Sequence, residues 1–159
     1  AEIEVIPLHG HIFDMVGYRT PDDVVFLADC VSSAATLEKY KIAYLYDVQA
    51  YLDTLDYVDT LTAKLFVPSH TEPIENIHEL TDINRRCVSD VRDKILSICA
   101  EPASFEAILQ RIFTDYGLSL NFEQYALVGS TLRSYLSWLL DSGKLAVSFE
   151  DNLLLWRAV

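Results

Sequence analysis

The chain has 159 residues, 51% of them hydrophobic, and a formal net charge of −12. This length fits one domain or a small domain with an appendage, and this apolar content is enough to bury a core, which excludes an intrinsically disordered chain. No apolar run approaches the ~18 residues of a membrane span, so no membrane partner is expected. The acidic balance repels phosphate groups and therefore disfavours nucleic acid as a nonspecific partner.

The N-terminal sequence and the cysteines bear on the origin of the chain. The chain opens AEIEVIPLHG, in strand-like alternation and without the basic segment of a signal peptide. We therefore expect a fragment, with further sequence belonging before Ala1. The three cysteines, Cys30, Cys87 and Cys99, are scattered and form no CxxC pair. That pattern is typical of reduced thiols in a cytoplasmic protein.

Strand and helix signals alternate over the first half of the chain. The sequence Thr20-Pro-Asp-Asp23 predicts a tight turn between two strands. The strand that follows it, Val24–Ala28, is continuously apolar and is expected to be buried on both faces of its sheet. A later, short strand should end at Pro68. The expected strands are 2–8, 15–19, 24–28 and 65–67, and the expected helices are 32–46 and 47–61.

The second half of the chain is predominantly helical. We expect a long amphipathic helix over 74–100, a helix that begins after Ser104, a third helix over 121–142, and two strands joined by the turn Glu150–Asn152. Three helices followed by a hairpin is the order of a winged-helix-like domain. The helix that would serve as its recognition helix carries Arg133 as its single basic residue, so scaffolding or dimerisation is favoured over DNA binding. The apolar stripe of the long helix is expected to comprise Ile77, Leu80, Ile83, Cys87, Val91, Ile95 and Ile98.

Three residues that follow apolar strands are candidate metal ligands: His11, Asp29 and His70. Imidazole and carboxylate groups suit a divalent first-row metal, with zinc as the default and iron or manganese as rivals. A carboxylate has two oxygens and can bridge two ions, and a two-metal site generates a hydroxide nucleophile near neutral pH. The spacing leaves alternatives open, because each histidine would also suit an ordinary loop and Asp29 would also suit a helix N-cap.

Three segments in order carry a resemblance to a known family. They are Pro7–His11, followed by Val16-Gly-Tyr18; Val24–Asp29; and Phe66–His70. They resemble the PGH, Gly-Asp and second PGH segments of the metallo-β-lactamase-fold hydrolases. The resemblance implies that His11 ligates one metal, that Asp29 bridges two, and that His70 ligates the second.

The sequence departs from that family in several places. Ala28 and Ser69 stand where the family has glycine, and His9 stands where it often has proline. His9 and Cys30 are further candidates, which would contact the metal ligands and not the metal itself. The family's first metal motif, HxHxDH, is absent from this chain.

The absent motif limits what the resemblance implies. The expected fold class is α+β: residues 1–74 would form the C-terminal half of an αββα metallo-β-lactamase-type sandwich, and residues 75–159 a long helix and a winged-helix-like domain. The implied parent protein is a metal-dependent hydrolase, with two zinc ions by default, that attacks an ester, thioester, amide or phosphodiester. Because the HxHxDH half is missing, the chain alone is expected to bind metal weakly and to be inactive.

Two kinds of partner are expected. Half a sandwich leaves an apolar sheet face uncovered, so its partner is either the missing N-terminal half of the domain or, for the isolated chain, a second copy in a homodimer. The alternative function is a non-enzymatic interaction module in which the acidic winged-helix-like domain mediates assembly. The sequence does not specify the small-molecule substrate.

Overall fold

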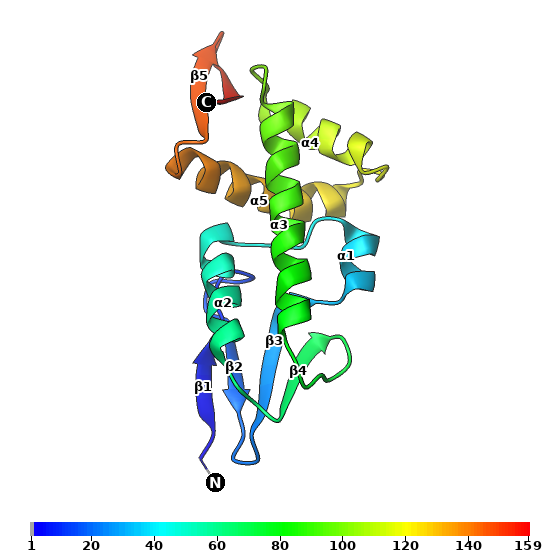
Figure 1. Ribbon diagram of the computed structural model, residues 1–159. Coiled ribbons are helices and arrows are strands. Elements are labelled where there is room, and N and C mark those ends of the chain that lie inside the picture. The colour runs from blue at the N-terminus through cyan, green and yellow to red at the C-terminus, as the bar shows by residue number, and fades with distance from the viewer. Residues whose placement is uncertain (1) are drawn as a thin grey trace. The chain divides into compact units, whose positions relative to one another are not determined.

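The computed structural model describes residues 2–159, which form two compact units, one ending at Val88 and the other beginning at Ser89 (Figure 1). The units meet within helix α3 (His78–Ile98). The domain boundary expected after residue 74 lies in the loop before this helix.

The first unit is built on a four-stranded sheet with the order β1-β2-β3-β4. The first three strands are antiparallel neighbours, and β4 runs parallel to β3. The expected turn joins β2 to β3, and in it the Thr20 N–H donates to the Val24 carbonyl at 3.0 Å. The strands are β1 (Glu4–Pro7), β2 (Val16–Arg19), β3 (Val24–Ser32) and β4 (Leu65–His70).

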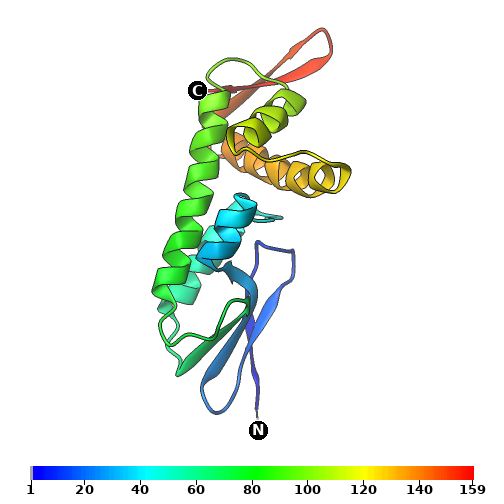
Figure 2. The ribbon, with the colours of Figure 1, turned by 90° about the vertical axis from the view of Figure 1, so that its right-hand side faces the viewer.

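Helices α1 (Ala34–Tyr40) and α2 (Val48–Thr60) connect β3 to β4. Each begins at a polar N-cap, because the side chains of Ser33 and Asp47 accept hydrogen bonds from backbone N–H groups of the first turn. Helix α2 and the first half of α3 lie on one face of the sheet (Figure 2). The buried core between them includes Ile6, Leu8, Val25, Leu27, Leu55, Val58 and Phe66.

Two strands are longer than the sequence indicated. The third runs on to Ser32, so that Asp29 lies inside β3 and the following helix is capped by Ser33 instead. The fourth continues through Pro68 to His70. Because β4 is an edge strand, whose outer side is paired within the described residues through the isolated Phe66–Ile74 bridge, it tolerates a residue without an N–H at Pro68.

The expectation that Val24–Ala28 is buried on both faces is wrong. Phe26 is 42% exposed, and its neighbours across the sheet, Tyr18 and Val5, are 46% and 59% exposed. We call Val5, Tyr18 and Phe26 the apolar row. It is exposed because the helices of this unit cover the opposite face of the sheet (Figure 2).

The buried stripe of α3 also differs from the expected one. Leu80, Ile83, Cys87 and Ile98 are only partly buried, because the centre of the buried face lies about one residue further along the helix. The helix begins at His78, and Ile74 instead pairs with Phe66 as a β-bridge. The buried face comprises Ile77, Thr81, Asn84, Val88, Val91, Ile95 and Cys99.

The second unit contains the end of α3, helices α4 (Phe105–Asp115) and α5 (Phe122–Asp141), and the hairpin β5 (Leu145–Glu150)–β6 (Leu153–Ala158). Ser104 and Asn121 cap the two helices, and the hairpin turn places Asp151 and Asn152 at φ of 48° and 64°. This is the expected order of elements, and the winged-helix assignment stays a prediction. Within residues 2–159 no helix is long and apolar enough to cross a bilayer.

Candidate functional site

The structure brings the side chains of His11, Asp29 and His70 together in the first unit. Asp29 lies between the two histidines: its Oδ2 is 3.7 Å from His11 Nε2, and its Oδ1 is 3.2 Å from His70 Nε2. Each carboxylate oxygen therefore faces a different imidazole. This arrangement matches the needs of a bridging carboxylate, and ligation itself stays a prediction.

An irregularity in β3 places Asp29. The pairing of β3 with β4 is regular up to Phe26↔Val67, after which β3 advances by two residues while β4 advances by one, giving Ala28↔Pro68. At this bulge Ala28 adopts a left-handed backbone with φ of 47°. Bulges re-aim the side chains that follow them. Glycine is the residue that best fits a left-handed position, so the alanine found here stands where the backbone favours glycine.

The loop that carries His11 is fixed to the start of α2 through Gly10. The Gly10 carbonyl accepts backbone hydrogen bonds from Tyr46 at 2.9 Å and from Asp47 at 3.0 Å. Gly10 has φ of 112°, and a Cβ atom there would lie 2.2 Å from the Tyr51 backbone nitrogen. No other residue fits so close an approach, so Gly10 determines where the next residue, His11, is held.

Asn84, which the sequence did not single out, holds the end of β3. Its side chain is 1% exposed and pairs with Ser32 like a neighbouring strand: the Ser32 N–H donates to Oδ1 at 3.1 Å, and Nδ2 donates to the Ser32 carbonyl at 2.9 Å. The Tyr51 hydroxyl donates to the same Oδ1 at 3.0 Å. The only sequence signal was a polar residue on the edge of an apolar stripe, which usually indicates a solvated position.

The two supporting candidates lie in different surroundings. His9 is exposed, and its Nδ1 is 3.0 Å from the Phe13 carbonyl, so its ring is held by its own loop. Cys30 is 0% exposed, and burial raises the pKa of its thiol to about 12. Because successive residues of a strand point to opposite faces, Cys30 points into the core while Asp29 is partly exposed. Their supporting roles stay predictions.

The donor set fits part of a metal centre. Two imidazole nitrogens and two carboxylate oxygens suit zinc, iron or manganese. The side chains of His11, Asp29 and His70 are 24%, 39% and 62% exposed, so an ion can reach them from solvent. Across residues 2–159, however, no group of three or more His, Cys, Asp or Glu side chains is placed so that it could hold a metal ion. The donor types of His11, Asp29 and His70 fit a metal, and their arrangement in this structure does not by itself form a metal site.

Comparison with known proteins identifies the fold. No protein-family model matches the chain, and no curated protein matches it by sequence. Among solved structures, a beta-lactamase domain protein from Burkholderia ambifaria aligns with 99% of this chain and 47% of its own, at a TM-score of 0.81 and 18% identity. A metallo-beta-lactamase family protein from Thermus thermophilus aligns with 98% of this chain and 49% of its own, at a TM-score of 0.75 and 12% identity.

These likenesses confirm the expected fold class. The chain is α+β and has the metallo-β-lactamase-type fold that the three sequence segments indicated. The chain spans about half the length of the solved structures that it matches. At these identities the likeness shows the fold alone.

Proposed function

We propose that this chain supplies part of the metal centre of a metal-dependent hydrolase of the metallo-β-lactamase fold. The observation that carries the proposal is the Asp29 carboxylate, whose two oxygens face His11 and His70. In this role His11 holds one ion, His70 holds the second, and Asp29 bridges them. Two ions, zinc by default and iron or manganese as rivals, would supply a hydroxide nucleophile near neutral pH. The substrate class is an ester, thioester, amide or phosphodiester.

The remaining ligands of such a centre must come from outside the three residues. An ion of this class takes about four ligands, so three side chains cannot complete two coordination spheres. The chain matches about half of each solved structure, which supports a partner segment that brings the other ligands. We therefore expect the chain alone to bind metal weakly and to hydrolyse no substrate, while its own residues hold and orient the ions.

Zinc titration by calorimetry tests this proposal. The wild-type chain should bind Zn²⁺ weakly, and Asp29→Asn should reduce the affinity at least about tenfold, since even the hydrogen-bond partners of metal ligands are worth 10–100-fold. The matched control is His78→Gln, because His78 is partnered by Asp59 at 3.1 Å, apart from the candidate ligands. Equal affinities for wild type and Asp29→Asn would remove Asp29 from the site. Two tightly held ions per chain would contradict an incomplete centre.

The second candidate function is a non-enzymatic interaction module. The exposed apolar row favours it, because contiguous exposed apolar side chains mark interaction surfaces. Zinc titration separates the two functions. A pure interaction module would show no Zn²⁺ affinity that depends on Asp29, and Asp29→Asn would leave its assembly state unchanged.

A further inference from the structure

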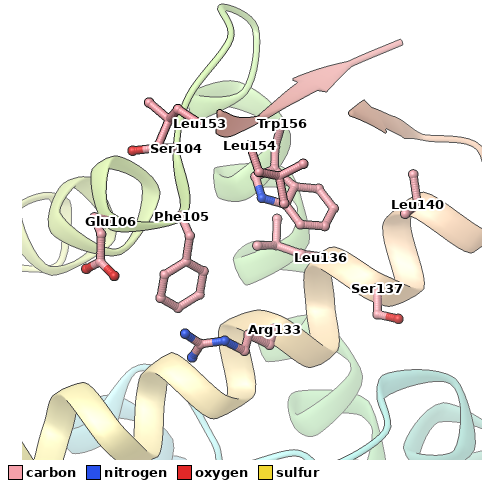
Figure 3. Close-up of a pocket in the computed structure, with 10 residues that line it drawn as sticks. All are labelled: Ser104, Phe105, Glu106, Arg133, Leu136, Ser137, Leu140, Leu153, Leu154 and Trp156. Carbon is pink, nitrogen blue, oxygen red and sulfur yellow. The ribbon is translucent and has the colours of Figure 1, made fainter. Parts of the chain in front are cut away.

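The second unit contains a pocket of about 510 Å³ (Figure 3). It is framed by the start of α4, the last turns of α5 and strand β6, and all of its lining residues lie between Ser104 and Trp156. This volume falls within the range of small-molecule sites, which combine apolar walls with a few placed polar groups. The apolar walls are formed by Phe105, Leu136, Leu140, Leu153, Leu154 and Trp156.

One polar group of the pocket lacks a partner. The Trp156 indole Nε1 is buried, and within the described part of the chain it donates to no acceptor. In Figure 3 this nitrogen lies on the side of the ring that faces Ser104 and Phe105 across the pocket. A buried N–H without an acceptor is costly, and indole nitrogens normally find one. The pocket wall therefore contains a buried hydrogen-bond donor that is matched by no acceptor within residues 2–159.

A positive charge lies at the same pocket. The Arg133 guanidinium lies over the Phe105 ring at 3.9 Å and donates to the Gly129 carbonyl at 3.2 Å, with the Tyr125 hydroxyl as a further neighbour. Among residues 2–159 no carboxylate lies within 4.0 Å of it. A guanidinium carries several N–H donors and no acceptor. Arg133 thus adds to the pocket a positive charge that no carboxylate contacts directly, with Glu106 linked to it through the Tyr125 hydroxyl, and further donors.

Two of the acceptors that line the pocket are engaged in hydrogen bonds. The Glu106 carboxylate accepts the Tyr125 hydroxyl at 2.8 Å. The Ser104 hydroxyl oxygen accepts the Ala107 N–H at 3.3 Å as the N-cap of α4. The Ser137 hydroxyl also lines the pocket and can donate or accept, whereas Trp156 and Arg133 offer donors only.

We propose that this pocket binds a small carboxylic acid with an apolar body. Its carboxylate accepts the Trp156 indole N–H and is balanced by the charge of Arg133, and its body packs against the leucines. A phosphate group fits less well, because it needs several cations and this pocket offers Arg133 with Glu106 nearby. The proposal does not depend on the metal-centre function of the first unit.

Nitrogen–proton NMR of the full chain with octanoate as the probe tests the proposal. The sequence has two tryptophans and therefore two indole N–H signals, and Trp138 does not line the pocket. Octanoate should shift the Trp156 signal and leave the Trp138 signal in place, which makes Trp138 an internal control. Trp156→Phe assigns the signals and should weaken binding. Octanamide, which lacks the charge, should bind about tenfold more weakly.

Two arginine variants separate a specific site from general electrostatic attraction. Arg133→Gln should weaken octanoate binding about tenfold and leave octanamide binding unchanged. Arg157→Gln removes the same charge from an exposed position of β6 next to Trp156 and should bind octanoate like wild type. If Arg133→Gln fails to fold, Arg133→Lys, which keeps the charge, takes its place. Octanoate binding is then followed through the shift of the Trp156 indole signal. The proposal is overturned if millimolar octanoate leaves the Trp156 signal unmoved, or if octanamide binds as well as octanoate.

Discussion

Ala28 is held in a left-handed backbone conformation, with φ of 47°, directly before Asp29. A residue with a Cβ atom is about 1–2 kcal/mol less stable in this region than in a right-handed one, whereas glycine is not penalised. We expect Ala28→Gly to raise the free energy of unfolding by about 1 kcal/mol, measured by urea denaturation.

The matched control is the same change at Ala35, which is exposed in helix α1 and has a helical backbone. There the greater freedom of glycine in the unfolded chain dominates, and Ala35→Gly should lower the free energy of unfolding by about 0.5–1 kcal/mol. If both variants were destabilised alike, Ala28 would not be strained.

Asp59 gives the first unit a pH-dependent contribution to stability. Burial opposes ionisation of its carboxyl, but hydrogen bonds from Thr81, Arg85 and His78 outweigh burial and hold its pKa below the ordinary value of 3.8. A group whose pKa is lower in the folded state stabilises the protein above its unfolded pKa, and this contribution is lost as the pH falls through the folded value. The contribution of Asp59 is therefore complete at neutral pH and declines progressively as the pH falls below about 4.

Asp59→Asn should accordingly lower the thermal midpoint at pH 7 and lower it by less at pH 3. Asp53→Asn provides the control, because it removes a carboxylate from the exposed face of the same helix, where its partner is Gln49. A constant difference between wild type and Asp59→Asn across this range would argue against the hydrogen-bonded carboxylate as the cause.

At the scale of elements, Asn84 links α3 to the end of β3 and to Tyr51 of α2. Asn84→Ala removes the side-chain partner of the part-buried Ser32 N–H and carbonyl, which should lower the free energy of unfolding by about 1–3 kcal/mol. Asp90→Ala, on an exposed position of the same helix, should change it by less than about 0.5 kcal/mol. Equal effects in urea denaturation would show that Asn84 is not a link between these elements.

The features that the sequence predicted well are determined by residues that lie close together in the chain. The Thr20–Asp23 turn and the helix start at Ser104 lie where expected, since turns and caps form among residues a few positions apart. The extent of β3 and β4 was underestimated, because it follows from pairing across the sheet that continues past Pro68.

The same distinction explains what could be predicted of the site. The proximity of His11, Asp29 and His70 was indicated by motif order and by their places near the ends of strands of one sheet. The bulge at Ala28 was not indicated, because it is a register property of two strands. The hydrogen bonds of Asn84 span 52 residues to Ser32, and no local pattern reveals such a pair.

At the scale of the whole molecule, the apolar row needs a cover. We propose that in the isolated chain a second copy provides it, giving a homodimer. Light scattering should report a dimer for wild type and a monomer for Tyr18→Lys, which places a charge in the row. Tyr57→Lys, on an exposed position of α2, should stay dimeric. A wild-type monomer at low concentration would contradict the proposal.

The central claim is that His11, Asp29 and His70 form part of a metal centre, and the histidine rings test it most directly. The chain has four histidines. His11 and His70 face Asp29 through Nε2, whereas His9 and His78 are engaged through Nδ1 with Phe13 and Asp59. In long-range nitrogen–proton NMR, Zn²⁺ should shift the Nε2 signals of His11 and His70 and leave His9 and His78 unmoved. Equal shifts at all four rings, or none at His11 and His70, would contradict the metal centre.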